Sequence, residues 1–215
     1  MTEHTHGDEI VRDEKFWDER YGSSSRVWSG DPNPQLVAEA AGLAPGRALD
    51  VGCGEGADAV WLARRGWDVV AADISGVALE RAARHAGEAD PIAAARIEWR
   101  KADLLVDPPE ADAYDLVSAQ YMQLPLEPRT RLFAALAASV GAGGTLLVVG
   151  HDPSDLDTGM PRPRNPEVFY LAGEVAGLLD DGWTVLVNAS RPRAAVTPDG
   201  VEITIADAVL VATRR

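Results

Sequence analysis

The sequence has a single cysteine, no long apolar run and no cluster of basic residues, and each of these shortages excludes a class of protein. Cys53 alone cannot form an internal disulfide, which agrees with a reducing compartment, and we predict a cytoplasmic location. No apolar run approaches the roughly 20 residues that cross a bilayer, so we expect no membrane partner. The first residues, MTEHTHGDEI, lack the basic and apolar regions of a signal peptide.

Positive charge is also scarce, because 20 Lys and Arg face 34 Asp and Glu and give a net charge of −14. Binding a nucleic-acid backbone needs clustered basic residues, so we expect no nucleic-acid partner. A chain of 215 residues with 46% hydrophobic residues suits one folded domain. We therefore predict a single domain over residues 1–215, with a mobile polar tail at residues 1–9 and a helical segment at residues 10–42. The pair His4 and His6 falls in that tail, and we expect no metal.

Short apolar strands and amphipathic helices alternate along most of the chain. This alternation predicts an α/β fold, a parallel sheet with right-handed crossovers and helices on both faces. The last two strands are joined by a loop of Arg, Pro and Gly without a helix, so they should form an antiparallel hairpin. The expected strands are residues 47–51, 68–72, 97–101, 114–119, 145–150, 183–189 and 201–213; the expected helices are residues 10–21, 35–41, 57–65, 77–86, 130–140 and 166–180, with a turn at 141–144.

The stretch LDVGCGEG, residues 49–56, places three glycines directly after the first expected strand. Glycine allows unusual backbone angles, and its missing side chain lets a ligand touch the backbone. In open α/β sheets, ligands bind beyond the carboxyl ends of the strands, where this loop lies. Gly52, Gly54 and Ala57 also fit the G-x-G-x-x-G/A pattern of dinucleotide-binding proteins, so the loop alone leaves the ligand open.

Three acids narrow the choice of ligand. Asp73 ends the second strand about twenty residues after the glycines, where an acid accepts hydrogen bonds from ribose hydroxyls. Asp103 follows the third strand, where it could accept from an adenine amino group. Asp50 precedes the first glycine, and an acid there would repel a diphosphate but attract an ammonium group. The pattern therefore favours adenosine joined to a cationic group, without phosphate.

Four segments, LDVGCGEG, AADIS, KADLL and YDLVSA, resemble the successive motifs of class I S-adenosylmethionine-dependent methyltransferases. The resemblance covers the chain from about residue 12 to its end. The stretch FWDERYGSSSRVWSGDPNPQLV is similar to the N-terminal segment of the small-molecule branch that includes tellurite-resistance and thiopurine methyltransferases, in which a Trp-rich segment folds over the cofactor. The resemblance implies a Rossmann-like sheet of seven strands, mostly parallel, with the last strand inserted antiparallel, and S-adenosyl-L-methionine as cofactor.

The resemblance also implies which residues contact that cofactor. Asp50 would lie near the ammonium group, Asp73 would hold the ribose, and Ile74 would pack on the adenine. The remaining expected contacts are Gly52, Cys53 and Gly54 at the methionine portion, Asp103 and Leu104 at the adenine edge, Ala119 and Gln120 beside the sulfonium, and Arg20, Tyr21 and Trp28 closing the site from the N-terminal side.

The methyl group would move to a small-molecule acceptor by in-line displacement, so the protein mainly has to orient the two reactants. Candidate acceptor contacts follow the ends of two strands: Tyr121 and Gln123 after the fourth, His151 and Asp155 after the fifth. Arg162 could sit over an anionic acceptor. His151 is the candidate general base, because a histidine can change its charge near neutral pH. The alternative is a loop histidine that bonds to backbone.

Two other functions are compatible with parts of this pattern. One is a protein of the same fold that binds S-adenosylmethionine without catalysis. The other is an NAD-dependent oxidoreductase, which is disfavoured by Asp50, by the antiparallel ending of the sheet and by the absence of a Tyr-x-x-x-Lys pair. The motifs specify neither the acceptor atom nor an oligomeric state.

Overall fold

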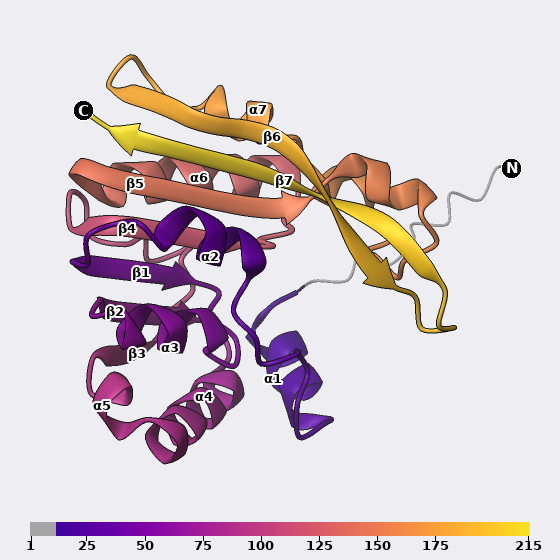
Figure 1. The fold of residues 1–215 in the computed structure, drawn as a ribbon, viewed down its shortest axis with the longest axis horizontal. Coiled ribbons are helices and arrows are strands. Elements are labelled where there is room, and N and C mark those ends of the chain that lie inside the picture. The colour runs from indigo at the N-terminus through magenta and orange to yellow at the C-terminus, as the bar shows by residue number, and fades with distance from the viewer. Residues whose placement is uncertain (1–11) are drawn as a thin grey trace, which may run out of the picture.

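The computed structural model describes residues 12–215 of the chain. These residues fold around a seven-stranded sheet (Figure 1). The strand order is β3-β2-β1-β4-β5-β7-β6, with β1 to β5 parallel and β7 inserted antiparallel between β5 and β6. This arrangement confirms the predicted Rossmann-like sheet with its antiparallel last strand. The strands are β1 (Arg47–Val51), β2 (Asp68–Asp73), β3 (Ile97–Lys101), β4 (Tyr114–Gln120), β5 (Val140–His151), β6 (Trp183–Val196) and β7 (Glu202–Arg214).

Side chains cap several of the helices. Asp13 Oδ1 accepts from the amide of Phe16, and Ser75 Oγ accepts from the amide of Ala78. Within residues 12–215, no helix is long and apolar enough to cross a membrane. The helices are α1 (Glu14–Gly22), α2 (Pro34–Ala40), α3 (Ala57–Arg64), α4 (Gly76–Ala89), α5 (Pro91–Ala94), α6 (Leu126–Ser139) and α7 (Ala172–Ala176), with short 3-10 helices η1 (Pro153–Asp157) and η2 (Pro166–Val168).

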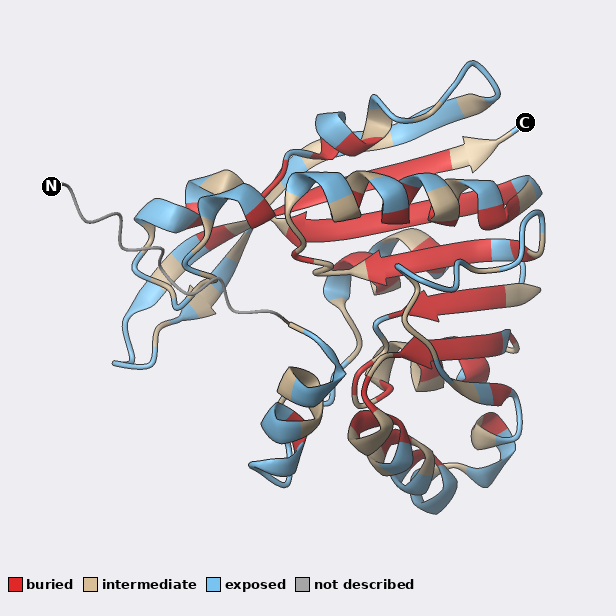
Figure 2. Ribbon diagram, turned by 180° about the vertical axis from the view of Figure 1, so that it is seen from behind, coloured by how far each residue is buried: buried red, intermediate tan, exposed pale blue. Residues whose placement is uncertain are grey.

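Two hydrophobic layers hold the helices against the sheet. On one face, Leu132 and Leu136 of α6 pack against β1, β4 and β5; on the other, Leu36 of α2 and Leu62 of α3 pack against the same strands. Figure 2 shows the buried residues concentrated along the central strands. Each fully buried leucine stabilises the fold by about 1.5–3 kcal/mol. The carboxyl ends of the five parallel strands therefore meet at one well-anchored edge.

The helix predicted for residues 166–180 is wrong. The chain there forms only the 3-10 turn Pro166–Val168 and the short helix Ala172–Ala176. Between them Tyr170 is buried, and its ring lies where a Cβ atom on Gly150 would approach to 2.5 Å. A continuous helix could not deliver this ring to the sheet, so tertiary packing overrides the local helical pattern.

The last two strands extend further than predicted. The residues after 189, which are expected to form a loop of Arg, Pro and Gly, instead extend β6 to Val196. As a result, β6 and β7 form a long two-stranded ribbon that projects past the rest of the sheet (Figure 1). Pro192 does not interrupt β6, because an edge strand has one side without ladder hydrogen bonds. Side chains of β6 alternate between partly and fully exposed, as expected for such an edge.

Two smaller differences from the prediction concern the start of α6 and the start of β5. The predicted helix 130–140 begins earlier, at Leu126, because Pro128 occupies the first helical turn, where its missing N–H has no helical partner to lose. The predicted turn at 141–144 belongs to β5. The tail predicted for residues 1–9, and the start of the helix predicted from residue 10, lie outside the described residues.

Candidate functional site

The glycine loop turns sharply between β1 and α3. Gly52, Gly54 and Gly56 all have positive φ angles, of 66°, 52° and 82°, which side chains disfavour. The loop folds back on β2, because the amides of Gly52 and Cys53 both donate to the carbonyl oxygen of Ala72, at 2.8 and 3.0 Å. The amide of Gly56 donates to the carbonyl oxygen of Cys53 at 2.9 Å. The turn is thus fixed by its own backbone.

Asp73, at the end of β2, completes this arrangement. Its Oδ2 atom accepts from the amide of Gly54 at 2.8 Å, and its Oδ1 atom accepts from the amide of Ser75 at 2.8 Å. Burial raises the pKa of Asp73, although these two amides favour the charged form. With Gly54 engaged by Asp73, the amides of residues 52, 53, 54 and 56 all donate within the protein. None of these four is left to hold a phosphate oxygen.

Asp50 is buried in β1, only 1% exposed, and its Oδ2 atom has no hydrogen-bond partner among the described residues. Burial raises the pKa of Asp50 well above its usual value, and the neighbouring Asp58 and Asp73 raise it further, while the amide of Ala59 lowers it. A buried acid without a full set of partners is unfavourable. A cationic group brought to this end of β1 would relieve that cost.

The N-terminal segment lies against the glycine loop. Tyr21 is 3% exposed, and its hydroxyl accepts from Nε1 of Trp28 at 2.9 Å. A Cβ atom on Gly54 would lie 2.7 Å from that hydroxyl and 3.4 Å from Nε1 of Trp28. The guanidinium of Arg20 lies over the ring of Trp28, 5.2 Å from its centroid. The structure therefore brings Arg20, Tyr21 and Trp28 together beside the loop.

The residues expected at the adenine and sulfonium lie at the same edge of the sheet. The amide of Ala102 donates to the carbonyl of Asp73 at 3.0 Å, so the segments carrying Ile74 and Asp103 follow adjoining strand ends. At the end of β4, Gln120 donates through Nε2 to Oγ of Ser118 at 2.7 Å, while its Oε1 atom is buried without a partner in the described structure. Leu104 and Ala119 belong to the hydrophobic layer that also contains α6.

An aromatic stack forms where β4 and β5 end. Tyr121 has a φ of 55°, unusual for a residue with a side chain, and its ring stacks on His151 with centroids 4.5 Å apart. Phe169 lies near the imidazole, at 6.3 Å. Nδ1 of His151 is buried and has no partner in residues 12–215. Backbone strain of this kind concentrates at functional sites, so the stack is a candidate wall for the acceptor.

His151 is predicted to be the general base because a histidine can change its charge near neutral pH, and the structure contradicts this reason. Burial lowers its pKa to about 4, and the nearby charge of Arg162 lowers it further. The ring is therefore neutral around pH 7 and does not change its charge there. In this state one ring nitrogen can accept a proton or a hydrogen bond, but the driving force for full deprotonation of an acceptor is small.

An NMR titration can check this state of His151. The carbon-bound ring protons should keep their chemical shifts between about pH 5.5 and pH 8, unlike an exposed histidine, which titrates near 6.5. The same lowered pKa makes stability depend on pH. Because native His151 holds its proton less tightly than the unfolded chain does, its contribution to the free energy of unfolding is fully present above the unfolded pKa and is lost as the pH falls toward about 4. A midpoint for His151 at or above 6.5 would contradict the buried stack.

Two of the expected acceptor contacts are paired with each other. Asp155 is fully buried, and its Oδ2 atom accepts from Nε and Nη2 of Arg162 at 2.9 and 2.6 Å. Its Oδ1 atom accepts from the amide of Ala206 at 2.7 Å. In its satisfied orientation, the amide of Gln123 donates to the carbonyl of Val168 and accepts from the amide of His151. Acceptor contacts through these side chains would require this bonding to be rearranged.

Sequence reasoning missed several charged groups that the fold brings to the site. Asp207 of β7 is fully buried and accepts from the hydroxyl of Tyr121 at 3.0 Å and from Nε of Arg193 at 2.8 Å. Glu55 of the glycine loop and Arg81 of α4 form an ion pair at 2.7 Å. The only sequence signal for these groups is that Glu55 falls inside the glycine motif. The partners of Asp207 and Glu55 are too distant in sequence to be recognised. No cluster of His, Cys, Asp or Glu in residues 12–215 could hold a metal ion.

Comparison with known proteins shows which family model and which solved structures the chain is similar to. Residues 48–144 match the family model described as "Methyltransferase domain". TehB from Haemophilus influenzae is similar in structure, with a TM-score of 0.66 and 18% identity over 94% of this chain and 67% of TehB. Magnesium protoporphyrin IX methyltransferase (ChlM) from Synechocystis, with bound SAH, has a TM-score of 0.60 and 19% identity over 94% of this chain and 83% of ChlM.

A third structure, described for the conversion of a disulfide bond into a thioacetal group during echinomycin biosynthesis, has a TM-score of 0.73 and 22% identity over 94% of this chain and 92% of that protein. Ribosomal RNA small subunit methyltransferase C from Alcanivorax borkumensis is 51% identical over 35 residues, which span 16% of this chain and 11% of that relative. The molecule thus has the fold of the class I S-adenosylmethionine-dependent methyltransferases, as the sequence motifs indicate. More particularly, its residues 48–144 are similar to the methyltransferase domain that this family model describes.

Proposed function

We propose that this protein binds S-adenosylmethionine and transfers its methyl group to a small-molecule acceptor. The observation that carries the proposal is the buried, unpartnered Oδ2 atom of Asp50 beside a glycine loop in which the amides of residues 52, 53, 54 and 56 are already used. Such a loop offers little to a diphosphate, and Asp50, Asp58 and Asp73 would repel one. A zwitterionic nucleoside with an ammonium group fits both features, whereas NAD fits neither.

The residues present fit that cofactor along its length. The carboxylate of Asp50 would bind the ammonium group, and each oxygen of Asp73 retains a lone pair for a ribose hydroxyl. Glycines at the loop allow close approach of the methionine portion. The remaining proposed contacts are Cys53 beside the methionine portion, Ile74, Asp103 and Leu104 around the adenine, and Ala119 and Gln120 near the sulfonium.

When bound, S-adenosylmethionine supplies an electrophilic methyl group on a sulfonium, and the protein has only to orient the acceptor and exclude water. Tyr21 and Trp28 lie over Gly54, where they would help to exclude water. Tyr121 and His151 form the proposed wall on the acceptor side. Because His151 is neutral at pH 7, it would accept a hydrogen bond or the released proton from an acceptor that is already a good nucleophile.

A small-molecule acceptor agrees with the charge of the chain, since a net charge of −14 disfavours binding to a nucleic acid. The structurally similar ChlM is a magnesium protoporphyrin IX methyltransferase, which is a precedent for a small acceptor on this fold. The relative that is named for ribosomal RNA matches only 35 residues of this chain. It therefore carries little weight for the choice of acceptor.

A thermal-shift measurement tests the cofactor. S-adenosylhomocysteine at 100 times its dissociation constant should add about 2.7 kcal/mol to the free energy of unfolding. For a chain of this size, that raises the melting temperature by about 5–10 °C. NAD at the same concentration should leave the melting temperature unchanged. Stabilisation by NAD without stabilisation by S-adenosylhomocysteine would refute the proposal.

A non-catalytic binding protein of the same fold is the second candidate, and turnover separates it from an enzyme. The protein is incubated with S-adenosylmethionine and thiol, phenol, amine or chalcogen acceptors, and the formation of S-adenosylhomocysteine is measured. Turnover with a small acceptor supports the enzyme. Binding of the cofactor without turnover on any of these acceptor classes favours the non-catalytic protein.

A further inference from the structure

A carboxylate from the glycine loop holds one end of the segment that covers the site. The side chain of Glu55 is 8% exposed, and its Oε2 atom accepts from the backbone amides of Val27 and Trp28 at 3.1 and 2.9 Å. Burial alone would raise the pKa of Glu55, but Arg81 and these amides lower it overall. Glu55 is therefore charged at neutral pH, and two amides of the covering segment point at that charge.

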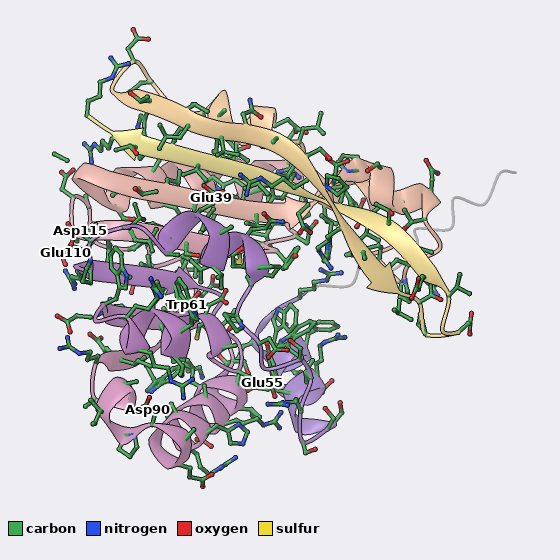
Figure 3. All side chains as sticks on the ribbon, in the orientation of Figure 1. Glu39, Glu55, Trp61, Asp90, Glu110 and Asp115 are labelled. Atoms are coloured by element: carbon green, nitrogen blue, oxygen red, sulfur yellow. The ribbon has the colours of Figure 1, made fainter. Side chains whose placement is uncertain are left out.

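A guanidinium from α4 holds the other end of the same segment. The side chain of Arg81 is 11% exposed, and its Nη1 atom donates to Oε1 of Glu55 at 2.7 Å. Its Nη2 atom donates to the carbonyl oxygens of Tyr21 and Ser24, at 2.6 and 2.9 Å. Figure 3 labels Glu55 where α1 lies against α4. The two charges thus bind each other and the backbone of residues 21–28 at the same time.

Little else fixes residues 21–28. Tyr21 is the single buried residue of α1, and the side chains from residue 22 to residue 26 are exposed. Nearby, Asp18 accepts from Oγ of Ser75 at 2.6 Å, and Glu14 pairs with Lys101 on the surface, where both side chains are about half exposed. Apart from Tyr21, hydrophobic burial in residues 21–28 is small, so the polar contacts of Glu55 and Arg81 hold the rest of this segment.

We propose that Glu55 and Arg81 are positioning residues for the cofactor site: together they clamp residues 21–28 over the glycine loop, and this clamp must open when the cofactor is exchanged. Opening the clamp would return both charges to water, and closing it buries them as a pair. Loss of either partner would leave a buried charge unpaired and favour the open segment. The identity of the ligand in this inference rests on the proposed function, but the clamp itself does not.

Hydrogen exchange of the ligand-free protein tests the clamp directly. In Glu55→Gln and Arg81→Lys, the amides of residues 21–28 should exchange at least about tenfold faster than in the native protein, since the exchange rate follows the population of the open segment. The control is Glu14→Gln, which removes a surface ion pair from the same N-terminal segment and should leave exchange unchanged. Arg81→Lys keeps the charge, and circular dichroism confirms that each variant is folded.

The second measurement is the dissociation rate of S-adenosylhomocysteine. It should rise by about tenfold or more in Glu55→Gln and Arg81→Lys, because the ligand leaves when the segment is open and these variants open more often. Faster exchange in a protein that does not bind S-adenosylhomocysteine would support the clamp and refute the proposed cofactor. Tight binding with native exchange in both variants would overturn the clamp, as would faster exchange with an unchanged dissociation rate.

Discussion

The Asp50→Asn variant is expected to be more stable than the native protein and to bind S-adenosylhomocysteine more weakly. Oδ2 of Asp50 is buried without a partner in the described residues, and Asp58 and Asp73 add to the cost of its charge. Replacing this acid with a neutral amide should raise the free energy of unfolding by about 1–3 kcal/mol, or the melting temperature by roughly 2–10 °C. The same change removes the partner of the ammonium group, so affinity should fall by about tenfold or more.

The pH dependence of stability identifies the carboxylate as the cause. In the unfolded chain Asp50 loses its proton near pH 3.9, whereas in the native protein the raised pKa retains it to higher pH. The native state then binds more protons, so stability falls as the pH rises above about 4. The advantage of Asp50→Asn over the native protein should therefore be absent near pH 4 and grow toward neutral pH.

Calorimetry and isothermal titration measure both effects, and Asp68→Asn is the control for the removal of an acid. The Asp68 side chain is exposed and pairs with Arg96 on the surface, so its loss should change stability by less than about 1 kcal/mol and leave affinity unchanged. If Asp50→Asn were less stable than the native protein, the buried charge of Asp50 would not be destabilising. If it bound S-adenosylhomocysteine as tightly as the native protein, Asp50 would not be the partner of the ammonium group.

The part of the fold that sequence predicts best is the central sheet. The strand Arg47–Val51 lies at its predicted position, because a buried parallel strand requires a short apolar run bounded by turn residues. The glycines of residues 52–56 are equally readable, since their positive φ angles admit few other residues. Local chemistry decides these features, so a single sequence is enough to find them.

Features decided by distant contacts could not be predicted in the same way. Tyr170 breaks the expected helix because its ring fills the space beside Gly150, and nothing local marks that fit. Arg81 lies on a helix whose pattern suggests an ordinary solvated face, yet it binds Glu55 and the backbone of the N-terminal segment. Likewise, Asp207 lies on β7 and accepts a hydrogen bond from the hydroxyl of Tyr121, which is 86 residues away in sequence.

The second large effect concerns Gly54, whose replacement by alanine should strongly weaken the binding of S-adenosylhomocysteine. Gly54 has a φ of 52°, so alanine there costs about 1–2 kcal/mol of backbone strain. In addition, the new Cβ atom would lie 2.7 Å from the hydroxyl of Tyr21. Because this contact is too short, Tyr21 must move, and the segment that covers the loop moves with it. We expect affinity to fall by about tenfold or more, measured by isothermal titration.

Gly66→Ala separates strain from close approach. Gly66 has a φ of 96°, but the nearest atom to its new Cβ would be 3.6 Å away, on Pro45. This variant should lose a similar free energy of unfolding and keep its affinity for S-adenosylhomocysteine. Adding Tyr21→Phe to Gly54→Ala removes the clashing oxygen and should restore part of the affinity, a non-additive result that only direct contact explains. Equal loss of affinity in Gly66→Ala and Gly54→Ala would instead assign the effect to loop strain.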